Sequence, residues 1–556
     1  MKPRPRAIRV LVLVAMIVTA TWVARAQNPQ AGRAGGVRAT PSLVVLLVVD
    51  QFPSEYIDLY SSRWTGGLRR LLRTGAMFTK AAYPYGLTVT CPGHSSIGSG
   101  LVPANHGMIG NTWYDRGLSK SVACTEDPMA TPVTFGSAEG KEHHSPRRML
   151  ARSFADQLRD QAQQPPTIVS LSLKARSAIG MAGHAGPKTM VMWLEDGGAF
   201  ATSSAYTTSP WPEINEFVTA NPPARDLDQV WTLLRPLNTY RFVDDGVAEA
   251  PPTGWTSVFP HALARTAGTA DAAYYANWQR SPWSDVYLGE LAATLTGRLR
   301  LGQSAGTDML AVSFSALDMA GHPFGPRSHE VQDILARLDL TIGRLLDSLD
   351  QQVGRDRYVV GFSSDHGVMV LPEQGPSMNL DTGRVSAAQL TAALTKAVED
   401  SVKVPLAVRN ASYPNVYLTD DALAAVKQNP AARKAITDAA LFVPGVQRVY
   451  WADELAGTAP TRDAVLERMR KSFVADRNGD LMVVSREYWQ ASTSGTTHGS
   501  PYPYDARVPV ILMGAGIKPG RYGSAATPLD LAPTFARLTG VSLERTDGRV
   551  LTDALR

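Results

Sequence analysis

Uninterrupted apolar runs, separated by longer mixed stretches, are the clearest pattern along this chain. Leu43 to Val49 contains only leucine and valine, and Met309 to Phe314, Tyr358 to Phe362 and Val508 to Met513 are of similar character. None of these runs alternates apolar with polar residues, as a half-exposed strand would. They predict strands that are buried on both faces, which is typical of a parallel sheet.

Helical spacing of apolar residues appears elsewhere along the chain. From Val331 to Leu349 such residues recur at intervals of three and four. Ser386 to Asp400 and Pro430 to Leu441 predict further helices, and Thr527 predicts the cap of a last helix that Gly540 ends. Together with the buried strands, these helices indicate an α/β protein.

Carboxylate and imidazole side chains gather close to the predicted strands. They are Asp50, Asp318, His322, Asp365, His366 and His498. Because ligands collect outside the carboxyl ends of parallel strands, we expect these groups to lie together. Aspartate and neutral histidine are ordinary zinc ligands, and six of them suffice for two zinc sites that each keep an open position. Two metals about 3.5 to 4 Å apart can hold the attacking and leaving oxygens of a phosphoryl displacement.

Each of these residues alone has an ordinary structural alternative. A single aspartate at a strand end is usually a helix cap or a turn residue, and most histidines are surface or core groups. The joint pattern favours a two-metal hydrolase site. The pair His143 and His144 has no comparable setting, and we interpret it as part of a solvated loop.

Thr90 lies in a segment that predicts the start of a helix. The segment has the sequence Thr88-Val89-Thr90-Cys91-Pro92-Gly93-His94. The amides at a helix start bind phosphate, and a metal lowers the pKa of a coordinated alcohol, so Thr90 is a candidate nucleophile. Without the metals it would only cap the helix. Cys91 is a rival, but a sulfatase-type motif needs Cys-x-Pro-x-Arg, and here Pro92 follows Cys91 directly.

These motifs resemble the alkaline phosphatase superfamily, in particular the type I phosphodiesterases and nucleotide pyrophosphatases and their phosphomonoesterase relatives. The resemblance runs from about Asp50 to the carboxyl end and includes Ser363-Ser364-Asp365-His366-Gly367 and Thr497-His498-Gly499. It implies a three-layer α/β sandwich around a central, mostly parallel sheet, with Thr90 as the nucleophile. It also implies two zinc ions per chain. One would be held by Asp318, His322 and His498, and the other by Asp50, Asp365, His366 and the Thr90 oxygen.

The metal-ligand candidates span nearly the whole of the 556 residues, so we expect one α/β core with two large insertions. The expected core segments are 41–116, 307–371 and 494–556. Residues 117–306 form the first insertion, which is expected to cover the substrate, and residues 372–493 form the second.

Two cationic residues, Lys174 and Arg176, predict how the substrate is selected. They are two residues apart in a segment that we expect to be a strand, which would place both side chains on one face. A monoester dianion gains from added cations, whereas a diester needs room for a second organic group. On its own, such a pair is more often a solvated face. It resembles the monoesterase branch of the superfamily, where an asparagine, here Asn111, joins the pair in binding phosphate.

The amino terminus predicts export. Basic residues precede an apolar run from Val10 to Val23, and Ala24-Arg25-Ala26 resembles a cleavage site, so we expect a signal peptide over 1–26 and a mature chain from about Gln27. The run is shorter than the ~20 residues of a membrane span, which argues against a stable membrane anchor. The signal peptide carries five basic and no acidic residues, which equals the whole net charge of +5. The mature chain is therefore near neutral, and its charge does not indicate nucleic-acid binding.

We therefore expect a periplasmic or secreted, monomeric, zinc-dependent alkaline phosphatase that hydrolyses small phosphate monoesters through a phosphothreonine intermediate. A phosphodiesterase or nucleotide pyrophosphatase with the same two zinc ions is one alternative. A non-catalytic protein that binds phosphate esters is another, although binding alone would not need Thr90. Aspartate and histidine accept several divalent ions, so the ligands do not fix the metal as zinc. The only two cysteines, Cys91 and Cys124, leave open whether they form a disulfide.

Overall fold

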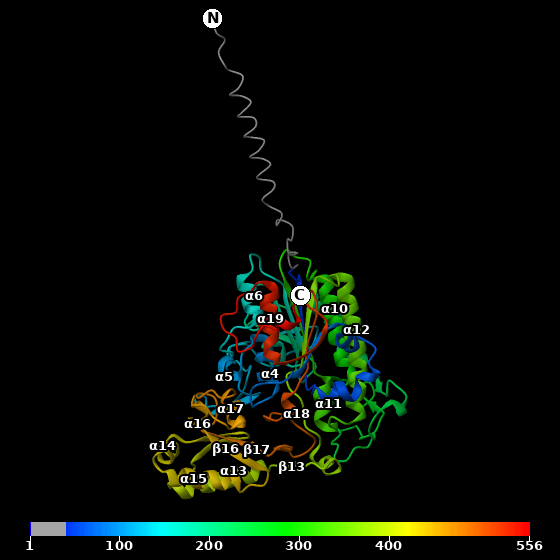
Figure 1. Cartoon of the computed structure of the whole chain (residues 1–556). Helices are drawn as coiled ribbons and strands as arrows, with labels where there is room; N and C mark the ends of the chain where they lie inside the picture. Colours follow the sequence, from blue (N-terminus) through cyan, green and yellow to red (C-terminus); the bar gives the residue numbers. More distant parts are fainter. Residues whose placement is uncertain (2–39) are drawn as a thin grey trace. The chain divides into compact units, whose positions relative to one another are not determined.

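The predicted buried strands form the centre of a ten-stranded sheet in the computed structural model (Figure 1). Strand β1 (Leu43–Val49) pairs in parallel with β11 (Asp308–Phe314) on one side and with β12 (Tyr358–Ser363) on the other. Strand β6 (Ile168–Ser172) continues the parallel arrangement beyond β11. Every residue of these four strands is buried, as the apolar runs predicted for β1, β11 and β12.

The outer strands make the sheet mixed. Five of its nine pairings are parallel and four are antiparallel. The run from Val508 to Met513 does contain a strand, β19 (Val510–Gly514), but it runs antiparallel to β12. The remaining strands are β20 (Gly520–Ala526), β2 (Ala76–Ala81), β7 (Thr189–Leu194), β8 (Phe200–Ser203) and β5 (Pro132–Phe135).

Helices cover both faces of this sheet, which gives the predicted three layers (Figure 1). The helices of one face are α2 (Glu55–Tyr60), α3 (Gly67–Thr74), α8 (Pro212–Ala220), α9 (Ala272–Gln279), α10 (Pro282–Arg298), α11 (Ala316–Phe324) and α12 (His329–Gln352). The helices of the other face are α4 (Thr90–Ser99), α6 (Phe154–Gln161), α7 (Ala175–Ala182) and α19 (Leu531–Thr539). Helix α12 contains the predicted run from Val331 to Leu349, and Gly540 ends α19 in the left-handed conformation.

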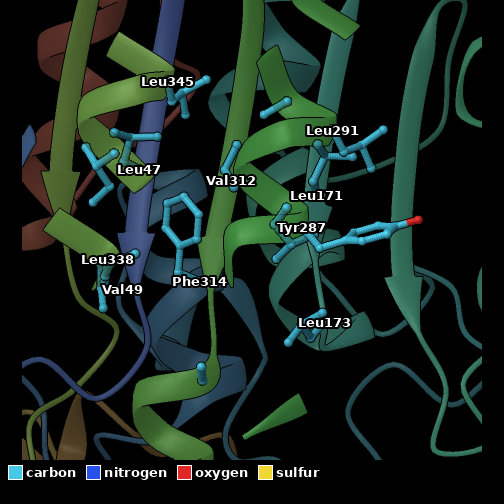
Figure 2. Packing of buried hydrophobic residues seen from close by; sticks show 14 of the residues in the cluster. Leu47, Val49, Leu171, Leu173, Tyr287, Leu291, Val312, Phe314, Leu338 and Leu345 are labelled. Atoms are coloured by element: carbon cyan, nitrogen blue, oxygen red, sulfur yellow. The ribbon is translucent and has the colours of Figure 1, made fainter. Parts of the chain in front are cut away.

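Alternate residues of the central strands build the larger core. In Figure 2, Leu47 of β1 and Val312 of β11 lie on the same side of the sheet as Leu291 of α10 and Leu345 of α12. Residues of opposite parity, such as Leu46, pack into the core on the other face. Because both faces are covered, the strands need no polar positions, which explains the apolar runs in the sequence.

The first predicted insertion, residues 117–306, contributes strands to the central sheet. It supplies four strands of the sheet, β5, β6, β7 and β8, while the three predicted core segments supply the other six. The boundary expected at residue 117 falls inside a separate two-stranded hairpin, whose strands are β3 (Thr112–Asp115) and β4 (Lys120–Ala123). The boundary expected at residue 117 therefore does not divide the sheet from an added layer.

Residues 372–493 contain a sheet of their own. Its strands, in spatial order, are β14 (Val408–Ser412), β15 (Asn415–Leu418), β17 (Leu481–Ser485) and β16 (Val446–Trp451). One face packs against α13 (Ala387–Val402), α14 (Asp420–Gln428) and α15 (Pro430–Leu441), which include both helices predicted in this segment. The other face packs against α16 (Ala452–Ala456) and α17 (Ala464–Arg470).

The structure describes residue 1 and residues 40–556. Apart from Met1, the predicted signal peptide therefore lies outside the described residues. Within the described part of the chain, no helix combines the length and the apolar character needed to cross a membrane.

Candidate active site

The four central parallel strands end at the same edge of the sheet, and the residues after them form the site. Asp50 directly follows β1, and Asp365 lies two residues beyond β12. Strand β11 leads into α11, which carries Asp318, and β6 leads to Lys174. The site thus occupies the position where an α/β sheet usually binds its ligands.

Asp318, His322 and His498 come together as the sequence predicted. Asp318 and His322 are one helical turn apart on α11, and their Oδ1 and Nε2 atoms are 3.2 Å apart. His498 Nε2 lies 3.7 Å from the same oxygen. The backbone carbonyls of Thr496 and Thr88 lie within 3.0 Å of the Nδ1 atoms of His322 and His498, respectively. Nδ1–H donation to these carbonyls leaves both Nε2 atoms free to bind a metal.

A second group forms around His366, whose ring stacks on that of His498 with 3.4 Å between centroids. His366 Nε2 lies 3.4 Å from Asp50 Oδ1, 3.2 Å from Asp365 Oδ2 and 3.5 Å from Thr90 Oγ1. The predicted set of Asp50, Asp365, His366 and Thr90 therefore lies together. Asp318 lies close to this second group as well, because one potential ligand atom each of Asp50, Asp318 and His366 lie within 4.8 Å of one another.

The charges at this site fit a metal centre. Asp50, Asp318 and Asp365 are buried, and Lys174 Nζ lies 2.6 Å from Asp50 Oδ2 and 2.5 Å from Asp318 Oδ2. Asp50 Oδ1 and Asp365 Oδ2 have no hydrogen-bond partner among the described residues. Burial, followed by the charges of Asp318 and Asp365, raises the pKa of Asp50 well above its ordinary value. Buried carboxylates that outnumber their cations in this way are stabilised by divalent ions.

Lys174 and Asp318 stabilise each other in their charged forms. Burial opposes the charge on Asp318, but Lys174, His322 and His498 outweigh it and hold the pKa of Asp318 well below its ordinary value. Burial likewise opposes the charge on Lys174, but Asp318 and Asp50 raise its pKa. The site therefore keeps a buried ammonium beside the candidate metal ligands.

The local structure around Lys174 differs from the prediction. The expected strand ends at Ser172, Lys174 occupies the N-cap of α7, and Arg176 lies in the first turn of that helix. The sequence could not show where the apolar strand would turn into a helix, because Leu173 and Ala175 suit both. Arg176 is half-buried, and its Nε has no partner among the described residues.

Two glycines allow α7 to lie directly against α4, whose first residue is Thr90. A Cβ on Gly98 would come within 2.2 Å of the Gly180 carbonyl oxygen, and a Cβ on Gly180 within 3.0 Å of the His94 Cβ. This close packing brings the start of α7, with Lys174 and Arg176, to the same region as Thr90.

Asn111 reaches the site from a different element. It directly precedes β3, and its side-chain oxygen accepts a hydrogen bond of 2.8 Å from the Cys91 backbone amide, next to Thr90 in sequence. Cys91 and Cys124, whose pairing the sequence left open, form a disulfide.

Gln51 and His94 also contact the site, although neither was predicted as a site residue from the sequence. Gln51 has a φ of +63°, and it donates from its backbone to Asp365 and from Nε2 to Asp318. His94 lies on α4, with Nδ1 3.0 Å from the Thr90 carbonyl oxygen and 3.3 Å from Asp365 Oδ2. Their proximity in sequence to Asp50 and Thr90 was the only available signal, because their contacts with Asp318 and Asp365 join segments roughly 270 to 310 residues apart.

The α/β fold and the cluster of a hydroxyl, an ammonium and paired carboxylates and imidazoles define a class, the metal-dependent hydrolases of phosphoric esters. The chain belongs to the type I phosphodiesterase/nucleotide pyrophosphatase family, whose model matches residues 44–503.

Several bacterial relatives match along nearly the whole chain. Alkaline phosphatase PhoV of Synechococcus elongatus is 30% identical, and the match covers 93% of this chain and 94% of the relative. Alkaline phosphatase PafA of Elizabethkingia meningoseptica is 31% identical, with 90% and 91% covered. The crystal structure of PafA superimposes with a TM-score of 0.84 over 93% of this chain and 99% of that chain, at 30% identity.

A solved variant of PafA carries substitutions of a threonine, an asparagine, a lysine and an arginine. In that protein the threonine and asparagine are 21 residues apart, and the lysine and arginine are two apart. Thr90 and Asn111, and Lys174 and Arg176, have the same two spacings in this chain.

Proposed function

We propose that this chain is a secreted, zinc-dependent alkaline phosphatase that hydrolyses phosphate monoesters through a phosphothreonine intermediate. The observation that carries the proposal is the buried Lys174 ammonium, which lies within 2.6 Å of carboxylates from both candidate ligand groups. Divalent cations held by those carboxylates would neutralise them and leave the ammonium available to phosphate oxygens. A doubly charged monoester gains more from such a cation than a singly charged diester does.

The names of the relatives support this substrate class, since PhoV and PafA are alkaline phosphatases. The matching spacings of threonine, asparagine, lysine and arginine in PafA support a joint role for the corresponding four residues here. Signal-peptide features at residues 1–26 support export. We further propose that the protein acts as a monomer on small phosphate esters, without nucleic acid or a membrane anchor.

In the proposed reaction, Thr90 Oγ attacks phosphorus while the ester oxygen departs on the opposite side. Asn111 Nδ2, Lys174 and Arg176 bind the non-bridging oxygens, and the free amides at the start of α4 add positive potential. Water then attacks the phosphothreonine, releases inorganic phosphate and restores the Thr90 hydroxyl. Two zinc ions, held by the six aspartate and histidine residues and the Thr90 oxygen, would lower the pKa of the nucleophile and stabilise the leaving oxygen.

The decisive experiment compares kcat/KM for an aryl phosphate monoester and its matched aryl methyl phosphate diester. The zinc-loaded mature protein is expected to prefer the monoester strongly, and a chelator should abolish both activities. A preference for the diester would instead assign the chain a phosphodiesterase activity. Thr90→Ala serves as the control, because full hydrolysis by that variant would exclude Thr90 as the nucleophile.

A further inference from the structure

The Cys91–Cys124 disulfide joins two elements of the candidate site. Cys91 is the second residue of α4, directly after Thr90, and Cys124 directly follows β4 of the β3–β4 hairpin. Within the hairpin, Thr112 pairs with Ala123, so Asn111 and Cys124 face each other just beyond the paired strands. The disulfide therefore fastens the open end of this hairpin to the start of the helix that carries Thr90.

Both cysteines also hold Asn111 through their backbone amides. The Cys91 N–H donates to the Asn111 side-chain oxygen at 2.8 Å, and the Cys124 N–H donates to the Asn111 backbone oxygen at 2.9 Å. One residue of the hairpin is thus bound at its side chain by one half of the cystine and at its backbone by the other.

These contacts determine which way the Asn111 amide points. A backbone N–H can only donate, so the group that faces Cys91 must be the amide oxygen. The Asn111 nitrogen then points away from Cys91, and no described residue accepts a hydrogen bond from it. Its two N–H groups therefore remain available to an anion.

The same bond replaces a missing helix cap. Val89 occupies the N-cap of α4 and has no side chain that could accept from the first free amides. Asn111 supplies that acceptor from a different element, 20 residues further along the chain. Its position is therefore coupled to the start of the helix rather than only to its own hairpin.

We propose that the Cys91–Cys124 disulfide is a positioning device that keeps the Asn111 amide nitrogen directed at the phosphate of the substrate. The inference rests on the proposed function for the identity of the bound group. Both cysteines are buried in a cluster with Met108, Ile109, Trp113, Val122 and Met149, so apolar side chains surround the covalent link. Small displacements of a group that binds the transition state lower turnover strongly, which gives this link a catalytic consequence.

The test is a double-mutant cycle between the disulfide and Asn111. Cys91→Ala/Cys124→Ala is expected to lower kcat/KM for an aryl monoester about 10-fold, and Asn111→Ala about 100-fold. In the Asn111→Ala background, loss of the disulfide should have less than about a 2-fold further effect, because the group that it positions is already absent. The same factor in both backgrounds would overturn the proposal.

A control variant separates positioning from general stability. Met149→Ala removes packing from the same buried cluster but keeps the disulfide, so it should lower the melting temperature without changing the ratio of monoester to diester turnover. If the double alanine variant does not fold, Cys91→Val/Cys124→Ala, which fills more of the cluster, takes its place. An unchanged monoester-to-diester ratio in a folded variant without the disulfide would contradict positioning.

Binding of inorganic phosphate, measured by calorimetry, provides a readout that needs no turnover. Removal of the disulfide from the wild-type protein should lower its phosphate affinity. Removal of the disulfide from the Asn111→Ala variant should leave the phosphate affinity of that variant unchanged. A wild-type protein that binds phosphate in this pattern but hydrolyses no monoester would refute the proposed function and leave the positioning role intact. Equal affinity with and without the disulfide would refute the positioning role alone.

Discussion

At the scale of single residues, the buried carboxylates of the site lie close together, and the cationic groups beside them compensate their negative charge only in part. Asp50 and Asp318 share one Lys174 ammonium, and Asp365 lies beside His94 and His366. A buried carboxylate without a partner is costly, so an arrangement of this kind is retained for binding or catalysis rather than for stability.

Removing the cationic pair is the first prediction at this scale. Lys174→Ala/Arg176→Ala is expected to lower kcat/KM for a monoester by about 100-fold or more, since two charge-assisted contacts to a dianion are lost. Turnover of a methyl diester should fall much less, because a diester carries one negative charge fewer. Steady-state kinetics on matched substrates measure both. An effect confined to the diester would show that the pair does not recognise the dianion.

At the scale of elements, the position of the site depends on how closely the helices pack. Helix α4 carries Thr90, α7 carries Lys174 and Arg176, and Gly98 and Gly180 let the two backbones approach. Alanine usually stabilises a helix relative to glycine by about 1 kcal/mol. At Gly98 the added methyl group would clash with the Gly180 backbone oxygen. The cost of this overpacking, about 1–3 kcal/mol, should exceed the gain in helix stability.

Gly98→Ala is therefore expected to destabilise the protein and to lower monoester turnover, because α4 and α7 must separate. Urea unfolding and kcat/KM measure the two effects. Gly523→Ala, in strand β20, is the control for a glycine substitution without a clash, since no atom beyond its chain neighbours lies within 4 Å of the position of its new Cβ. A Gly98→Ala protein that is as stable and active as the wild type would show that the helices tolerate the shift.

A buried acid links helix α10 to helix α11. Asp285 accepts hydrogen bonds from the backbone amides of Ser315 and Ala316 at the start of α11, which carries Asp318 and His322. Its second oxygen has no partner among the described residues, and burial raises its pKa from 3.8 to about 7. The folded state therefore binds the proton more tightly than the unfolded state does.

This shift predicts how stability depends on pH. The stabilisation of the folded state by protonated Asp285 is fully present below about pH 4. It is lost as the pH rises to about 7, and the stability lost over this range is roughly 4 kcal/mol. Asp285→Asn should remove this loss, so the variant should gain stability relative to the wild type between pH 4 and pH 7. Urea unfolding across that range measures the difference. A difference that does not change with pH would contradict a raised pKa.

At the scale of the whole molecule, the site exists only because distant parts of the chain fold together. Asp50 follows the first strand of the sheet in sequence, whereas His498 comes after the second predicted insertion. An ion bound by these residues favours the folded chain over the unfolded one, because the unfolded chain does not bring its ligands together.

Metal removal should therefore affect stability as well as activity. Chelation is expected to lower the melting temperature by a few °C or more, and added zinc should restore it. Asp50→Asn should reduce this dependence, because it removes one ligand and one buried charge. Calorimetry with and without chelator measures the effect. Identical melting curves in both conditions would argue against a metal bound by the folded state.

The sequence by itself determined the class of fold and the candidates for the chemistry. The buried strands could be predicted because a strand covered on both faces needs an apolar residue at every position, which is a local property. The acids and histidines could be singled out because they lie close in sequence to these strands, which is also a local property. The structure brings them together.

Only the tertiary structure decided the relations between segments. It showed that β19 is antiparallel, that residues 117–306 supply four strands, and that Lys174 caps a helix instead of lying in a strand. It also revealed the contacts of Gln51 with Asp365 and Asp318. It showed in addition that the two disulfide-bonded cysteines donate backbone hydrogen bonds to Asn111. Such pairings depend on which surfaces meet after folding, and no local pattern of residues encodes them.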